Sequence, residues 1–394
     1  MKSDIKHENS TTLVELSGKI TSSNAPDFES SIFNEPNETD GIIFNVKELE
    51  FISSAGLRVL LKAKKRCGKK IFKIINASED IMNIFDITGF SEIMDISKAV
   101  RSVSIDGCEK IGAGACGEVY RLDDETIVKL YYPRIKKEDI EQEKALSKKA
   151  FVLGIPTAIS YDIVDVGGRV GVIYELINSK TLTELIRDNP SNIEKYVEMY
   201  ADVCRLIHST KEESGVLPRF KDINRTDIPL ISGVTKEERD FLFKFLDLVP
   251  DAQTCIHGDL NINNIMVQNG ECCLIDMGEF STGTAMFDIS RIIFSMHFAP
   301  DDSQYNSFYK LPQKTVDEIL EMFIKKYFNV SSIEEAEQEN SDVKWLYPLA
   351  WFRCCTSFLK GDRWPQNKRD EALELLHKKL MPFVDEYEKQ ITNM

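Results

Sequence analysis

A polar segment inside an apolar stretch, Ile256 to Ile265, carries the residues best suited to chemistry. Phosphoryl transfer needs a carboxylate beside the attacking hydroxyl and oxygen ligands for the Mg²⁺ that bridges the phosphates. Asp259 fits the first role. Asn264 and the downstream Asp276 fit the second, because magnesium prefers hard oxygen ligands and keeps several waters. We expect His257 to support the loop rather than to react.

Glycines recur upstream in the pattern Gly112-x-Gly114-x-x-Gly117, with Val119 two residues further on. The pattern alone is weak, because dinucleotide-binding folds carry it between a strand and a helix. Here the glycines lie between two predicted strands, as in the loop that covers the ATP phosphates in protein-kinase-like folds. The missing side chains would let the backbone approach the phosphates, and Val119 would pack on the purine.

Lys129 follows on the next predicted strand and would supply a cation for the α- and β-phosphates. A carboxylate must hold it in place. Glu143 on the following helix is the candidate and Glu141 the alternative, and their spacing puts them on different helix faces. A single Lys–Glu pair is usually a solvated surface contact. The position of Lys129 between two other motifs favours a role in nucleotide binding.

The same motifs resemble the aminoglycoside phosphotransferase and choline kinase group over about residues 105 to 385. Gly258 stands where many protein kinases have arginine, and only residues 277–287 separate Asp276 from Asp288, which leaves no room for a protein-substrate platform. The resemblance implies ATP and Mg²⁺ as cofactors, and Asp288 as an anchor of the catalytic loop. We expect His208 to be a core histidine with satisfied hydrogen bonds.

This resemblance implies an α+β protein-kinase-like bilobal domain, with a β-rich N-lobe at about 105–178 and a mostly helical C-lobe at about 179–390. Helices at 316–328, 345–359 and 370–387 would form the acceptor side of the cleft. An aromatic stripe at helical spacing is more often core, so no binding role is assigned to five residues of the second helix that could line the cleft: Trp345, Tyr347, Trp351, Phe352 and Arg353. The acidic run 334–342 would favour a cationic acceptor.

Residues 1–100 alternate strand-like and helical segments, which predicts an α/β layer. The sequence motifs at residues 16–20, 49–57 and 85–90 resemble those of the STAS domain of anti-sigma factor antagonists. In that family a serine at a helix N-terminus is phosphorylated. Here Ala55 precedes the glycine and Asn45 replaces the usual aspartate. We expect Ser53 and Ser54 to cap the helix. The domain then serves for docking or dimerisation rather than as a phosphoswitch.

Composition and charge limit the partners and the cellular compartment. A net charge of −15 argues against nucleic acid and an anionic membrane. The nine cysteines are irregularly spaced, as in a cytoplasmic protein with reduced thiols. The pattern breaks near residues 97–107, which predicts domains at 1–100 and 101–394.

The sequence thus predicts a cytoplasmic phosphotransferase that uses ATP and Mg²⁺ on the hydroxyl of a small molecule, aminoglycoside- or choline-like. Its STAS module would bind a protein partner. One alternative is a regulatory protein of the anti-sigma factor antagonist type, whose kinase-like domain phosphorylates a protein. A third is a scaffold that binds nucleotide without turnover.

Overall fold

The computed structural model describes residues 1–394 except 9–10, 35–39, 301–303, 362–363 and 393–394. The chain divides into two compact units. The first comprises residues 1–104 with 164–168, and the second comprises 105–163 with 169–394. No helix in the described ranges is long and apolar enough to cross a membrane.

The first unit is a five-stranded sheet with helices packed on it. The strands follow the order β1-β2-β3-β4-β5, and only the β1–β2 pair is antiparallel. Phe28, Leu60 and Phe85, one from each of three helices, are fully buried in a single core with the sheet. The strands and helices are β1 (Lys2–Glu8), β2 (Thr11–Ile20), α1 (Ala25–Phe33), β3 (Gly41–Ile52), α2 (Ser54–Cys67), β4 (Ile71–Ala77), α3 (Glu79–Ile87), α4 (Phe90–Ile93) and β5 (Asp95–Lys98).

Local sequence explains where α2 begins and ends. The Ser53 hydroxyl accepts a hydrogen bond from the backbone N–H of Gly56 at 3.3 Å, and Gly68 at φ +60° stops the helix. Ser54 is the first residue of the helix and is exposed, so the expectation that both serines cap the helix is right for Ser53 alone. Asn45 lies within β3 rather than at its end.

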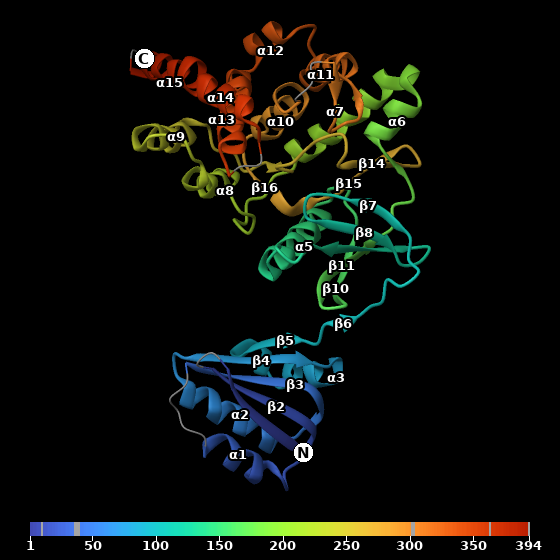
Figure 1. The fold of residues 1–394 in the computed structure, drawn as a ribbon, viewed down its shortest axis with the longest axis vertical. Coiled ribbons are helices and arrows are strands. Elements are labelled where there is room, and N and C mark those ends of the chain that lie inside the picture. The colour runs from blue at the N-terminus through green and yellow to red at the C-terminus, as the bar shows by residue number, and fades with distance from the viewer. Residues whose placement is uncertain (9–10, 35–39, 301–303, 362–363, 393–394) are drawn as a thin grey trace. The chain divides into compact units, whose positions relative to one another are not determined.

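The second unit begins with an antiparallel sheet in the order β10-β11-β9-β8-β7, against which α5 packs (Figure 1). Its hairpins form where the sequence predicts them, since Gly167 and Gly168 both adopt positive φ between β10 and β11. Its elements are β7 (Lys110–Ala113), β8 (Gly117–Arg121), β9 (Thr126–Tyr131), α5 (Lys137–Val152), β10 (Ser160–Val166) and β11 (Arg169–Glu175). Strand β6 (Arg101–Ser102) belongs to the first unit and pairs with Val164 and Asp165 at the end of β10, which are also assigned to the first unit.

The rest of the second unit is mostly helical, and short strand pairs hold its loops. Its helices are α6 (Leu182–Asp188), α7 (Ile193–Ser209), α8 (Phe220–Asp227), α9 (Lys236–Leu248), α10 (Met286–Ile293), α11 (Gln313–Phe328), α12 (Ile333–Glu339), α13 (Leu346–Phe358), α14 (Gln366–Leu375) and α15 (Met381–Thr392). Its strands are β12 (Lys180–Thr181), β13 (Cys255–Ile256), β14 (Ile265–Gln268), β15 (Glu271–Leu274), β16 (Ser281–Thr282), β17 (Tyr305–Asn306) and β18 (Leu311–Pro312).

The two units thus have the predicted fold classes, an α/β layer and a kinase-like α+β domain. The predicted last helix, 370–387, is two helices joined by a wide turn at Leu376–Leu380. All nine cysteines are free, and most are buried. Burial raises the pKa of Cys273 to about 12.

Candidate active site

The glycine pattern forms the β7–β8 hairpin. The backbone N–H of Gly114 donates to the carbonyl of Gly117 at 2.9 Å, which closes the loop. A Cβ at Gly117 would lie 2.5 Å from the Leu130 carbonyl oxygen, so no larger residue fits against β9. Gly112 pairs with Val119, and Val119 in turn pairs with Lys129 across the sheet. The hairpin therefore brings the loop, the valine and the lysine to one place.

Lys129 contacts two carboxylates. Its Nζ lies 2.7 Å from Glu143 Oε1 on α5 and 2.7 Å from Asp276 Oδ1 after β15. Burial alone would lower the pKa of Lys129, but the charges of Asp276 and Glu143 outweigh it and raise that pKa. Glu141, the alternative partner, pairs instead with Lys137 at 3.4 Å on the surface. Of the two candidates, the geometry selects Glu143.

Two tyrosines complete the surroundings of Lys129, and sequence patterns did not predict them. The Tyr174 hydroxyl donates to Glu143 Oε1 at 3.3 Å, and the ring of Tyr131 lies 5.2 Å from Lys129 Nζ. Burial raises the pKa of both phenols, so both stay neutral. They help to fix the ion pair.

Asp288 organises the loop that carries Asp259. Its carboxylate is fully buried and accepts the backbone N–H groups of His257 and Gly258, both at 2.7 Å. His208 Nε2 lies 3.1 Å from the same carboxylate, and Nδ1 lies 2.7 Å from the Tyr327 hydroxyl. His208 is therefore a core histidine with both ring nitrogens partnered, and the loop conformation rests on Asp288.

His257 is buried, and its Nε2 donates to the Ile275 carbonyl at 3.1 Å. Its Nδ1 accepts the backbone N–H of Asp259 at 3.3 Å. Both ring nitrogens are thus used in holding the loop. The structure gives His257 the supporting position that the sequence analysis expected.

Gly258 has a steric reason to be glycine. Its φ is +84°, and a Cβ there would lie 2.5 Å from Glu279 Cβ and 2.7 Å from the Glu279 carbonyl. The segment Met277–Glu279 therefore packs directly on the loop that carries Asp259. An arginine at this position, as in many protein kinases, has no space.

Asp259 is held from two sides. The Asn264 amide donates to the Asp259 carbonyl at 2.9 Å and to Asp259 Oδ2 at 3.3 Å. On the other side, Arg291 Nη2 of α10 lies 2.6 Å from Asp259 Oδ1. Arg291 was not predicted, although a lone arginine in a mostly apolar helix was a usable signal.

Asn264 and Asp276 provide atoms that suit a divalent cation. Asn264 uses its amide N–H groups on Asp259, which leaves Oδ1 as a hard oxygen ligand. Asp276 uses Oδ1 on Lys129, which leaves Oδ2. Burial would raise the pKa of Asp276, but the positive charge of Lys129 outweighs it and lowers that pKa, so the carboxylate stays charged. The donor set fits Mg²⁺.

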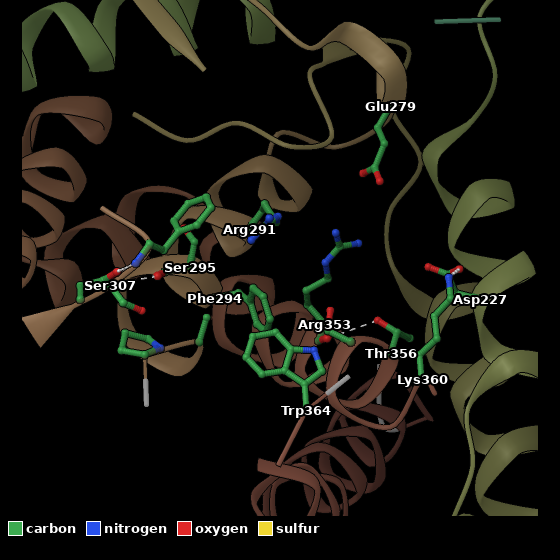
Figure 2. Close-up of a pocket in the computed structure, with 15 residues that line it drawn as sticks. Asp227, Glu279, Arg291, Phe294, Ser295, Ser307, Arg353, Thr356, Lys360 and Trp364 are labelled. Atoms are coloured by element: carbon green, nitrogen blue, oxygen red, sulfur yellow. Dashed lines mark hydrogen bonds and ion pairs between the residues drawn. The ribbon is translucent and has the colours of Figure 1, made fainter. Parts of the chain in front are cut away.

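A pocket of about 490 Å³ is lined by Arg291, the partner of Asp259 (Figure 2). Residues from α8, α10, α13 and the segments around them line it. Of the five residues that could line the acceptor side, Arg353 alone is among them. Trp345 and Phe352 are buried in the core, and the acidic run on α12 does not line the pocket.

Two family models match the chain. The model described as a phosphotransferase enzyme family covers residues 107–318, and the STAS domain model covers residues 2–103. The chain belongs to this phosphotransferase family and carries an N-terminal STAS domain. It is therefore a phosphotransferase by family.

The chain is similar to known proteins over each of these two parts. The anti-sigma-B factor antagonist of Bacillus subtilis (strain 168) is 28% identical over 96 residues, which are 24% of this chain and 88% of that protein. The aminoglycoside phosphotransferase APH(2'')-Ib, solved with ADP, is 16% identical, with 70% of this chain and 94% of that chain covered and a TM-score of 0.46. A choline/ethanolamine kinase family protein from Mesorhizobium loti is 14% identical, with 70% of this chain and 87% of that chain covered and a TM-score of 0.44.

Proposed function

We propose that the chain transfers the γ-phosphoryl group of ATP to a hydroxyl of a small molecule, with Mg²⁺ as cofactor. The observation that carries the proposal is the position of Asp259. Its carboxylate is hydrogen-bonded to the metal-ligand candidate Asn264 and paired with Arg291, which lines a pocket of about 490 Å³. Through these two partners Asp259 connects the candidate metal site with the pocket.

The nucleotide would bind between the β7–β8 hairpin and Lys129. Lys129 would hold the α- and β-phosphates, with Glu143 keeping its side chain in place. Gly112, Gly114 and Gly117 would let the backbone approach the phosphates. Asn264 Oδ1 and Asp276 Oδ2 would hold Mg²⁺, which neutralises charge on the phosphate oxygens when bound.

Asp259 would act on the acceptor. As the acceptor oxygen forms its bond to the γ-phosphorus, the bond from that phosphorus to the β–γ bridging oxygen breaks and ADP leaves. The hydroxyl proton passes to Asp259 Oδ2. Arg291 would orient the carboxylate before the acceptor arrives.

We infer a docking role for the STAS domain, with a protein as its partner. Ser53 is occupied as the cap of α2, while Ser54 is exposed one residue later. A phosphate at Ser54 would lie in the first turn of a helix, where unpaired N–H groups favour negative charge. This position supports regulation through α2 if Ser54 is modified.

The test is phosphoryl transfer from γ-labelled ATP in the presence of Mg²⁺, with a panel of hydroxylated small molecules that includes aminoglycosides and amino alcohols. Label on a small molecule is expected. Asp259→Asn should lower kcat by about 10²–10⁴-fold with nucleotide affinity nearly unchanged. Asp240→Asn, an exposed carboxylate on α9, is the control and should keep full activity.

Two results would overturn the proposal. Label that appears only on protein would favour the regulatory alternative. Nucleotide binding without any ATP consumption would favour the scaffold.

A further inference from the structure

Among the residues that the structure describes, five charged side chains line the pocket that Arg291, the partner of Asp259, helps to form. Arg291, Arg353 and Lys360 are positive, and Asp227 and Glu279 are negative. Figure 2 shows Arg353 extending into the middle of the pocket, between Arg291 on one side and Asp227 with Lys360 on the other. Their pairing decides which charge is left for a ligand.

Two of the three cations already have partners. Arg291 pairs with Asp259 at 2.6 Å, and Lys360 pairs with Asp227. Arg353 makes no side-chain hydrogen bond or ion pair with any residue that the structure describes, and its Nε is buried without a partner. A buried guanidinium N–H with no acceptor is costly, which makes Arg353 the group in this pocket that most needs a ligand.

Glu279 does not neutralise Arg353 in this structure. The two side chains face the same space in Figure 2, yet no ion pair within 4.0 Å joins them, and Glu279 Oε2 is itself buried without a hydrogen bond. Burial raises the pKa of Glu279 in spite of the nearby charge of Arg353, which favours the neutral carboxyl. No carboxylate among the described residues therefore pairs with the charge of Arg353.

The walls around Arg353 strengthen any interaction with an anion. Phe294 and Trp364 line the pocket beside it, and apolar walls reduce the screening by water. A guanidinium presents its N–H groups as a planar fork that matches a carboxylate or a phosphate in bidentate geometry. A cationic acceptor would instead meet an unpaired positive charge.

We propose that the acceptor alcohol carries an anionic group, a carboxylate or a phosphate, which binds Arg353 while the hydroxyl faces Asp259. This inference rests on the proposed function and narrows its substrate class, away from the cationic acceptors that the acidic run on α12 suggested. That run lies outside the pocket, so it does not set the pocket's preference.

Four probes that share a three-carbon skeleton test the proposal. Glycerate carries a carboxylate, glycerol 3-phosphate a phosphate, 3-amino-1,2-propanediol an amine, and glycerol no charge. Binding is measured by NMR titration of the full chain saturated with Mg²⁺ and a non-hydrolysable ATP analogue, which blocks the phosphate sites at Lys129. At least one anionic probe should bind about tenfold more tightly than the amine and glycerol. The glycerate and glycerol 3-phosphate arms then distinguish carboxylate from phosphate.

Three variants assign the preference to Arg353. Arg353→Gln should remove the preference for the anionic probe, with an affinity loss of about tenfold. Arg353→Lys should keep part of this preference. Lys314→Gln removes a positive charge from the exposed start of α11, outside the pocket, and should change nothing. Unchanged affinity for the ATP analogue shows that each variant is folded.

Equal binding of all four probes, or tighter binding of the amine, would overturn the proposal, and so would an anion preference that survives Arg353→Gln. None of these results depends on turnover. A protein that phosphorylates an amino alcohol would therefore keep the proposed function and refute the anionic acceptor, whereas anion binding at Arg353 without transfer to any hydroxyl would refute the function alone.

Discussion

Lys129 Nζ and Asp276 Oδ1 are 2.7 Å apart, although 147 positions separate the two residues in the chain. The contact joins the sheet of the second unit to the loop that follows β15, and Glu143 approaches the same Nζ from α5. Three elements therefore meet at one ammonium group. Neither the hairpin nor the loop would hold the lysine in this position by itself.

Replacing Lys129 with alanine tests this arrangement. Glu143 and Asp276 would lose their shared cation, and the free energy of unfolding should fall by on the order of 2 kcal/mol, because hydrogen bonds to charged groups are lost. Affinity for ATP, measured by calorimetry, should also fall by about tenfold or more.

The surface pair between Lys137 and Glu141 on α5 provides the control. Both side chains are about half exposed, so Lys137→Ala should change stability by under about 1 kcal/mol and leave ATP affinity intact. Equal effects of the two alanine variants on stability and ATP affinity would mean that Lys129 contributes no more than an exposed lysine.

Asp288→Ala should cost more stability than a typical carboxylate deletion. The variant leaves the N–H groups of His257 and Gly258 buried without acceptors, at about 1–3 kcal/mol each. Urea denaturation should be followed in the transition that ATP shifts, because the chain has two units and need not unfold in one step. Asp202→Ala, which removes an exposed ion pair with Arg205, should have a urea midpoint close to that of the unmodified protein. Similar midpoints for both variants would contradict the anchoring role of Asp288.

Gly258→Ala separates steric contact from backbone conformation. The added Cβ would lie 2.5 Å from Glu279 Cβ, and the residue would keep a φ of +84° that L side chains rarely adopt. Gly270 has nearly the same φ, +87°, but nothing lies within 4 Å of an added Cβ, so Gly270→Ala isolates the backbone term. We expect Gly258→Ala to destabilise more, by over about 1 kcal/mol beyond the control, and to lower kcat. Equal destabilisation of the two variants would show that Met277–Glu279 moves aside.

Residues whose roles follow from local spacing were accessible from the sequence. The interval between Asp259, Asn264 and Asp276 indicates a phosphotransferase loop before any coordinates, and the cap at Ser53 follows from residue type. Arg291 was not accessible in this way. Its role depends on how α10 packs against the loop 30 residues upstream, a tertiary relationship without a local pattern.

The same limit explains the elements and pocket residues that were missed. Strand β1 has alternating charged residues and few apolar ones, so its strand character comes from pairing with β2 rather than from its own sequence. Arg353 and Trp345 were both named on the same predicted helix, but helical spacing does not show which of them lines a pocket and which lies in the core. Burial does: Trp345 is in the core, while Arg353 faces the pocket.

Glu279 gives a prediction with a definite sign in pH. Its folded-state pKa lies above its value in the unfolded chain, about 4.3, because burial penalises the charge. A raised folded pKa means that the stability belonging to the protonated form is fully present below the unfolded pKa. It is lost as pH rises through the folded pKa. The native protein therefore carries a penalty at Glu279 that grows above pH 4.

Glu279→Gln removes that penalty, because glutamine has the shape of the neutral carboxyl and cannot ionise. The variant should have nearly the same Tm as the unmodified protein at pH 4 and a higher Tm at pH 8, measured by calorimetry in the transition that ATP shifts. Glu271→Gln, an exposed residue of β15, should shift Tm by a small amount that does not depend on pH over this range. A Tm difference for Glu279→Gln that is constant from pH 4 to 8 would show that folding does not raise the pKa of Glu279, and that the charges of Arg353 and Arg291 offset its burial.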